Sequence, residues 1–208
     1  MLRASVVILV LAAAGVRADD GALERLQAEN ARLEARVREL EAENASLRAR
    51  VGTVEAAADR TVSARVDDEG GVTALEVEPS RLELTGGNRS RHWIALHAEQ
   101  GGGAQIEIEA SASNGAYRGA ERLELSLDGM PLTLPVTARS AVPIVAGPQQ
   151  QRVGERETVR IAVPTDTVAR IGAARAVSGR LGPTTFVLSA EQIASFAAVA
   201  RRLESGAR

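Results

Sequence analysis

Two histidines and a pair of glutamates are the side chains whose types and spacing could support chemistry. His92 and His97 lie five residues apart in a segment that reads as one strand, so they point to opposite faces and cannot bind one metal ion together. Glu107 and Glu109 place two carboxylates on one strand face, as a glycosidase pair requires. Apolar residues alternate with them, which is typical of the solvated face of a half-buried strand. We therefore predict no metal site and no catalytic carboxylates.

Composition removes several other kinds of chemistry. The chain has no cysteine, and all 25 basic residues are arginine, which excludes thiol nucleophiles, Schiff bases and the phosphate-loop lysine. The Gly-x-Ser-x-Gly signature of serine hydrolases is also missing. A net charge of −2 and 2% aromatic residues argue against a nucleic-acid partner. We expect no cofactor and no enzyme activity, with an unrecognised hydrolase as the alternative left open.

Residues 1 to 18 have the pattern of a signal peptide. A short positive start at Arg3 precedes an apolar run from residue 4 to 16, and Ala18 supplies the small residue before a cut at Asp19. Thirteen apolar residues are fewer than the about 20 that a membrane-spanning helix needs. We predict export to the periplasm or beyond the cell, with tethering to the inner membrane by an uncleaved signal as the alternative. After cleavage, no segment should span a membrane.

Residues 22 to 58 resemble a leucine zipper. Apolar residues recur there in alternating steps of three and four, which predicts a coiled-coil helix. The a positions are Leu23, Asn30, Val37, Asn44 and Val51, and the d positions are Leu26, Leu33, Leu40, Leu47 and Val54. We predict that these ten residues mediate self-association, since a single helix would leave the leucines in water.

The polar positions of the zipper favour a parallel dimer. An asparagine at position a, such as Asn30 or Asn44, is best satisfied by its own counterpart in a parallel, in-register pair. Pairs of g and e′ residues that attract across such a dimer are Arg36 with Glu41, Glu43 with Arg48, and Arg50 with Glu55, whereas Glu29 faces Glu34. Pairing with a related chain, or a trimer, also fits the pattern.

Residues 59 to 208 are expected to form one α+β domain. The predicted strands cover residues 62–66, 72–78, 92–98, 105–111, 123–127, 130–134, 157–163, 176–181 and 184–188, and two helices cover residues 165–174 and 190–203. The fold class is therefore α+β: an N-terminal parallel coiled-coil helix, followed by a mainly antiparallel β-sheet domain covered by two C-terminal helices. Trp93, Tyr117 and Phe196 are expected in its core.

Three local patterns make this prediction specific. Asp128-Gly129 predicts a two-residue hairpin turn that pairs Leu127 with Met130 and places the hairpin's leucines and Met130 on one face. Ser189, followed three residues later by Gln192, predicts a capping box at the start of the last helix. Residues 141 to 151 are rich in Pro, Gly and Gln and predict a loop.

The stretch from about Trp93 to Leu203 resembles a loose group of uncharacterised exported bacterial α+β domains. The shared features are Trp93, the Asp128-Gly129 hairpin and an ending with Ile171, Ala174-Arg175, Arg180, Gly182, Phe186, Leu188 and Leu203. The resemblance covers about half of the chain and implies the fold and the export. It transfers no functional residue.

Two functions agree with these observations. The first is an exported, non-catalytic structural or interaction protein that dimerises through its coiled coil and presents the α+β domain to a protein partner in the cell envelope. The second is a periplasmic module that binds a small ligand or a peptide, in the manner of a chaperone. A concave pocket in the α+β domain would favour the second.

Overall fold

The computed structural model describes residues 20–66, 72–85, 90–99, 102–112, 115–117 and 119–206. The predicted signal peptide, residues 1 to 18, lies outside them. The chain separates into two compact units, one up to Ala49 and one from Arg50 onward. The elements of the chain are α1 Asp20–Thr61, β1 Val62–Val66, β2 Val72–Arg81, β3 Glu83–Leu84, β4 Arg91–Glu99, β5 Ala104–Ala112, β6 Arg122–Leu127, β7 Met130–Ala146, β8 Gln151–Val163, α2 Thr165–Ala173, β9 Val177–Leu181, β10 Thr184–Val187 and α3 Ala190–Gly206.

The first unit consists of the larger part of α1. Alanine, glutamate, arginine and leucine dominate this helix, and no proline or glycine interrupts it between Ala22 and Val51. These residue types have high helix propensity, which favours the helix of 42 residues.

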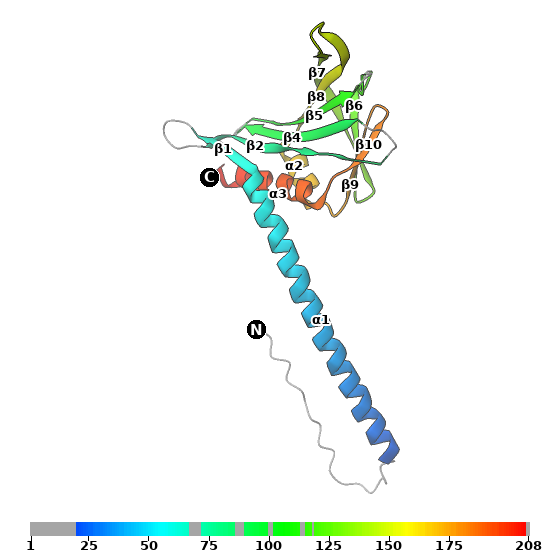
Figure 1. Cartoon of the computed structure of the whole chain (residues 1–208). Coiled ribbons are helices and arrows are strands. Elements are labelled where there is room, and N and C mark those ends of the chain that lie inside the picture. Colours follow the sequence, from blue (N-terminus) through cyan, green and yellow to red (C-terminus); the bar gives the residue numbers. More distant parts are fainter. Residues whose placement is uncertain are drawn as a thin grey trace. The chain divides into compact units, whose positions relative to one another are not determined.

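The second unit is an antiparallel sheet with two helices, which confirms the predicted α+β class. Its described strands follow the order β1-β2-β4-β5-β8-β7-β6-β9-β10-β3. Strand β3 continues β2 after a single residue, Leu82, whose backbone N–H donates to the carbonyl of His92 at 2.9 Å. Because β3 also pairs with β10, the continuous segment from β2 to β3 takes part in the sheet near both ends of the strand order. Helices α2 and α3 lie side by side on one side of the sheet (Figure 1).

The core fills the space between the sheet and the helices. Alternate residues of the central strands point inward, so that Ile94 and Ile108 are buried between their neighbours. Helix α2 contributes Val168 and Ile171, and the apolar face of α3 contributes residues that include Phe196. This is the alternation that a sheet with one solvated face requires.

Local chemistry positions α3 as expected. The Ser189 N–H donates to Gln192 Oε1 at 2.9 Å, and the Gln192 N–H donates to Ser189 Oγ at 3.2 Å, which together confirm the capping box. The Gln192 amide also donates to Ser80 Oγ at 2.8 Å and to the Arg81 carbonyl at 3.1 Å. The start of α3 is thereby joined to the end of β2.

The predicted hairpin is present with the predicted register. Asp128 and Gly129 have φ angles of 51° and 87°, as a two-residue turn requires, and Leu127 pairs with Met130. The Asp128 carboxylate accepts hydrogen bonds from the backbone N–H groups of Arg175 and Ala176, so the turn is tied to the start of β9. Met130 is 66% exposed, because it lies next to the turn at the end of the buried leucine row.

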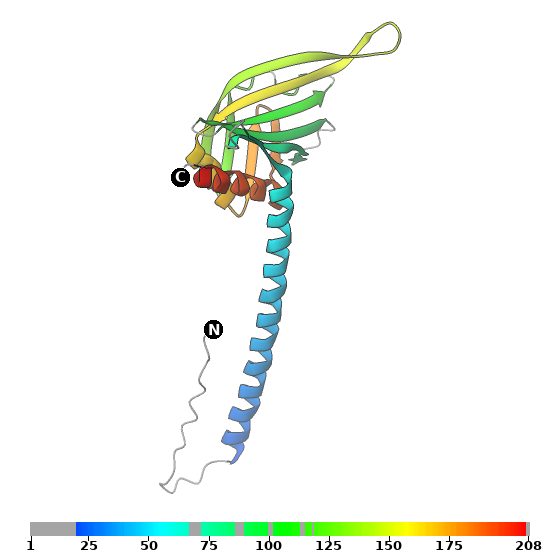
Figure 2. The same ribbon diagram turned by 90° about the vertical axis from the view of Figure 1, so that its left-hand side faces the viewer.

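The predicted loop over residues 141 to 151 is wrong. Strand β7 continues to Ala146 and β8 begins at Gln151, so that the two form a long hairpin, visible in yellow in Figure 2. Among the described residues, β6 pairs only with Met130–Pro135 of β7. The rest of β7 therefore has one unpaired edge, and prolines such as Pro143 occur in sheets mainly on edge strands of this kind.

Candidate functional site

The predicted association residues form a row of exposed side chains along α1. The large apolar members are between 41% and 59% exposed, and they are Leu26, Leu33, Val37, Leu40, Leu47 and Val51. Asn30 and Asn44 are also exposed, Val54 is half-buried, and Leu23 lies in the helix with its side chain outside the described residues. Within one chain, six large apolar side chains of this row thus face solvent.

The polar groups of this row make contacts within the helix. The Asn44 amide donates to the carbonyl of Leu40 at 3.0 Å. Arg36 pairs with Glu39 at 2.5 Å, three residues along the helix, with both side chains more than half exposed. Exposed pairs of this kind contribute only about 0.2 to 1 kcal/mol, so both groups can exchange these contacts for partners on another helix.

The end of α1 belongs to the second unit and is fastened there by α3. The guanidinium of Arg202 donates to the carbonyls of Asp59 at 3.1 Å and Val62 at 2.8 Å, which satisfies acceptors that a helix end leaves open. Thr61 Oγ1 lies 3.0 Å from Ser195 Oγ, and Ala58 is buried. The last turn of α1 is therefore part of the folded domain.

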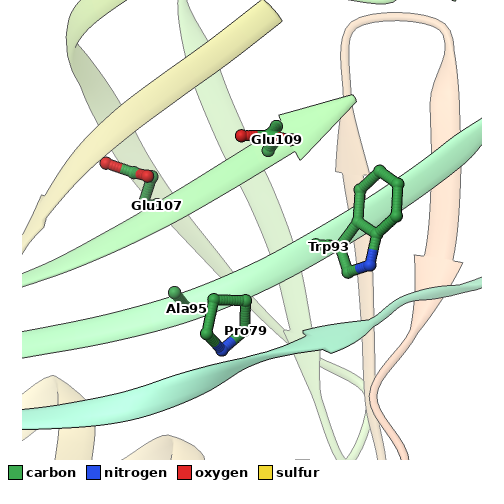
Figure 3. A pocket seen from close by; sticks show the side chains of 5 residues that line it. All are labelled: Pro79, Trp93, Ala95, Glu107 and Glu109. Carbon is green, nitrogen blue, oxygen red and sulfur yellow. The ribbon is translucent and has the colours of Figure 1, made fainter. Parts of the chain in front are cut away.

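A hollow of about 210 Å³ lies on the outer face of the sheet, at a place where the residue pattern predicts no pocket. It is lined by Pro79, Trp93, Ala95, Glu107 and Glu109. Figure 3 shows these side chains on β2, β4 and β5.

The prediction that Trp93 belongs to the core is wrong, because β4 turns His92, Ile94 and Leu96 inward and leaves the indole half-buried on the opposite face. Tyr117 and Phe196 are buried as predicted.

A second hollow of about 180 Å³ has a polar lining. It is lined by Gly119, Ala120, Glu121, Arg122, Glu124, Arg180 and Gly182. Arg122 and Glu124 face each other at 3.4 Å, with both side chains well exposed. None of the described residues that line this hollow has a large apolar side chain, so this part of the structure lacks the apolar surface that usually supplies binding free energy in a pocket.

The histidines are placed as their spacing predicted, on opposite faces of β4. His92 is 1% exposed, and its Nδ1 hydrogen-bonds to the hydroxyl of Tyr117. The backbone N–H of Tyr117 donates to Glu157 Oε2 at 2.6 Å. Burial lowers the pKa of His92. Burial raises the pKa of Tyr117, and the charge of Glu157 raises it further. This buried cluster lies in the domain interior, whereas His97 is half-exposed.

The carboxylates that were weighed as a catalytic pair are each paired with an arginine of β8. Arg160 Nε donates to Glu107 Oε2 at 2.9 Å, and Arg156 Nε lies 3.4 Å from Glu109 Oε1. Over the residues that the structure describes, no group of three or more His, Asp or Glu side chains is arranged to hold a metal ion.

None of the helices in the described ranges is long and apolar enough to span a membrane. Comparisons with protein-family models, with curated proteins and with solved structures find no match to this chain. The resemblance to exported bacterial domains therefore stays a prediction. Two surfaces of the chain are candidates for a function: the heptad row of α1 and the hollow beside Trp93.

Proposed function

We propose that this protein is an exported, non-catalytic interaction protein that pairs with a second copy of itself through α1 and presents its α+β domain to a protein partner in the cell envelope. The observation that carries the proposal is the row of exposed heptad residues on α1. Leu26, Leu33, Leu40 and Leu47 are each at least 41% exposed in the single chain. Burying a leucine side chain stabilises an assembly by about 1.5 to 3 kcal/mol, so a partner helix is strongly favoured.

Charge and polarity favour a second copy as that partner. In a parallel, in-register pair, Arg36 would face Glu41 and Glu43 would face Arg48 of the other chain. All four side chains are exposed, and Arg36 would exchange its exposed pair with Glu39 for one with Glu41 of the other chain. Asn44 would exchange its hydrogen bond to the Leu40 carbonyl for one to its counterpart, as asparagines at position a do in parallel dimers.

Light scattering on the chain without residues 1 to 18 tests the assembly. We expect the mass of two chains at micromolar concentration. The double substitution Leu33→Glu and Leu40→Glu would place two charges per chain in the apolar seam between the helices, so we expect this variant to have the mass of one chain. The matched control is glutamate at Ala35 and Ala42, which lie on the outer side of the same turns. A single-chain mass for the unmodified protein would refute the assembly.

The hollow beside Trp93 favours the second candidate function, a module that binds a small ligand. It is concave, it has an aromatic wall, and its polar groups come from an adjacent strand. These features are common to small-molecule sites. The two functions are compatible, since dimerisation uses α1 and the hollow lies on the sheet.

A further inference from the structure

The hollow beside Trp93 owes its shape to the sizes of the side chains around it. Ala95 is the small residue of the outer face of β4 and forms the floor. The indole of Trp93, two residues earlier on β4, forms one wall (Figure 3). On β2 the pairing with β4 is irregular between Val77 and Ser80, which brings the ring of Pro79 to the lining. A flat aromatic ring and a proline ring therefore bound a shallow apolar floor.

The polar side of the hollow carries charges that are already balanced. Glu107 and Glu109 lie directly opposite Ala95 and Trp93 in the sheet register. Each carboxylate is paired with one guanidinium of β8, at 2.9 Å for Arg160 and 3.4 Å for Arg156. Two negative and two positive groups leave no net charge to attract a cation or an anion. They do offer hydrogen-bond acceptors and donors side by side, with the two glutamate side chains 26% and 34% exposed.

From this combination we infer that the hollow binds one ring of an uncharged saccharide. The C–H face of a sugar ring is apolar and packs on an aromatic plane, while its hydroxyls both donate and accept hydrogen bonds. Here the face would lie on Trp93, and the hydroxyls would donate to the carboxylates of Glu107 and Glu109. At about 210 Å³ the hollow is smaller than the roughly 300 to 1,000 Å³ of pockets that enclose a whole drug-sized ligand. It fits a single ring of a longer glycan that continues over the sheet surface.

Trp93 is the only tryptophan of the chain, so intrinsic fluorescence reports directly on this hollow. The full chain is titrated with maltotriose and with the trimer of N-acetylglucosamine, and in parallel with arginine and with citrate as charged probes. We expect a saturable change in Trp93 emission with at least one of the saccharides and none with the charged probes. No saturable change with either saccharide, or one with a charged probe alone, would overturn the inference.

Two variants and one control locate the binding. Ala95→Leu fills the floor without touching the inner face of β4, and we expect it to weaken saccharide binding about tenfold or more. Glu107→Gln keeps the shape of the hollow but removes one charged acceptor, whose hydrogen bonds to hydroxyls are worth about tenfold in affinity. Glu124→Gln, in the second hollow, should bind as the unmodified chain does. Unchanged binding by folded Ala95→Leu and Glu107→Gln chains, checked by circular dichroism, would contradict the site.

This inference does not depend on the assembly of α1. The titration measures saccharide binding to the sheet of each chain, whereas light scattering measures the mass of the assembly that α1 forms. A chain that is monomeric can still show the saccharide response, and a dimer can lack it. The failure of either proposal is therefore distinguishable from the failure of the other.

Discussion

Burial determines the chemical behaviour of His92. The imidazole lies on the inner face of β4, bonded to the Tyr117 hydroxyl, and its Nε2 has no hydrogen-bond partner among the described residues. The titratable groups of this cluster are Tyr117 from the segment after β5 and Glu157 from β8. Burial disfavours the charged form of the ring and so lowers its pKa below the ordinary 6.5. A neutral histidine is therefore built into the folded state.

The stability of the domain should depend on pH through this residue. Because the pKa of His92 is lower in the folded state than in the unfolded state, the unfolded chain takes up the proton first as the pH falls. The contribution of neutral His92 is fully present above about pH 6.5 and is lost as the pH falls toward the folded-state pKa. We expect urea unfolding to show a decreasing free energy of unfolding from pH 7.5 to about pH 5.

Two histidine-to-glutamine variants isolate the contribution of His92 to the pH dependence of stability. His92→Gln keeps a hydrogen-bonding side chain but cannot be protonated in this range, so its free energy of unfolding should fall less steeply with pH than that of the unmodified chain. His97→Gln, on the outer face of the same strand, is the matched control and should keep the original slope. Equal slopes for His92→Gln and the unmodified chain would contradict the assignment.

Trp93 shows which residue-scale features a sequence leaves open. Both faces of β4 carry apolar residues, with Trp93 and Ala95 on one and Ile94 and Leu96 on the other. The alternation of side chains then indicates a strand, but it does not tell which of the two apolar faces of β4 is buried. Trp93 can be placed outward only once β4 is paired with β5, because Glu107 and Glu109 then share its face of the sheet.

At the scale of elements, α2 and α3 depend on one close approach. A Cβ atom at Gly172 of α2 would lie 2.5 Å from the backbone nitrogen of Ala197 and 2.6 Å from its Cα. Those atoms belong to the backbone of α3 and cannot move aside as a flexible side chain could. Glycine therefore allows the two helices to pack at this distance.

Gly172→Ala should lower the free energy of unfolding. Overpacking a well-filled contact typically costs about 1 to 3 kcal/mol, which exceeds the gain of up to about 1 kcal/mol from the better helix propensity of alanine. Urea denaturation followed by circular dichroism gives the difference. Gly103→Ala is the control, because a Cβ there meets no atom within 4 Å. A Gly172→Ala chain as stable as the unmodified one would mean that the helices are farther apart than described.

Elements with strong local signals were predictable. The Asp128-Gly129 turn and the Ser189 to Gln192 capping box are formed by neighbouring residues, so their geometry follows from short-range chemistry. The continuation of β7 to Ala146 was not predictable in this way, because proline and glycine in residues 141 to 151 indicate a loop. Pro143 lies in a stretch of β7 that has no strand on its other edge within the described residues, and proline is tolerated on such edge strands. Local sequence does not contain this fact about pairing.

At the scale of the whole molecule, the sequence predicts the class of the fold but not its strand order. The pairing of β5 with β8 joins Ile108 to Val159, about fifty residues apart, and the meeting of β3 with β10 brings Leu84 to Phe186. Such contacts depend on the packing of the complete core. The hollow beside Trp93 depends on the same long-range pairing, since its lining comes from three strands. The heptad row, by contrast, lies on one helix, so its members can be listed from the sequence alone, and their role in association stays a prediction.

One introduced cysteine can show whether two copies of α1 pair in parallel and in register. The chain has no cysteine, so Leu26→Cys provides a unique thiol at position d. In a parallel, in-register pair this thiol faces its own counterpart at a separation that a disulfide can bridge. Ala28→Cys, on the outer side of the same turn, is the control.

The measurement is the mass of the mildly oxidised protein on a non-reducing gel. We expect a covalent dimer for Leu26→Cys, which a reducing agent returns to the single chain, and predominantly single chains for Ala28→Cys. Single chains for Leu26→Cys, or equal cross-linking of both variants, would contradict a parallel pair.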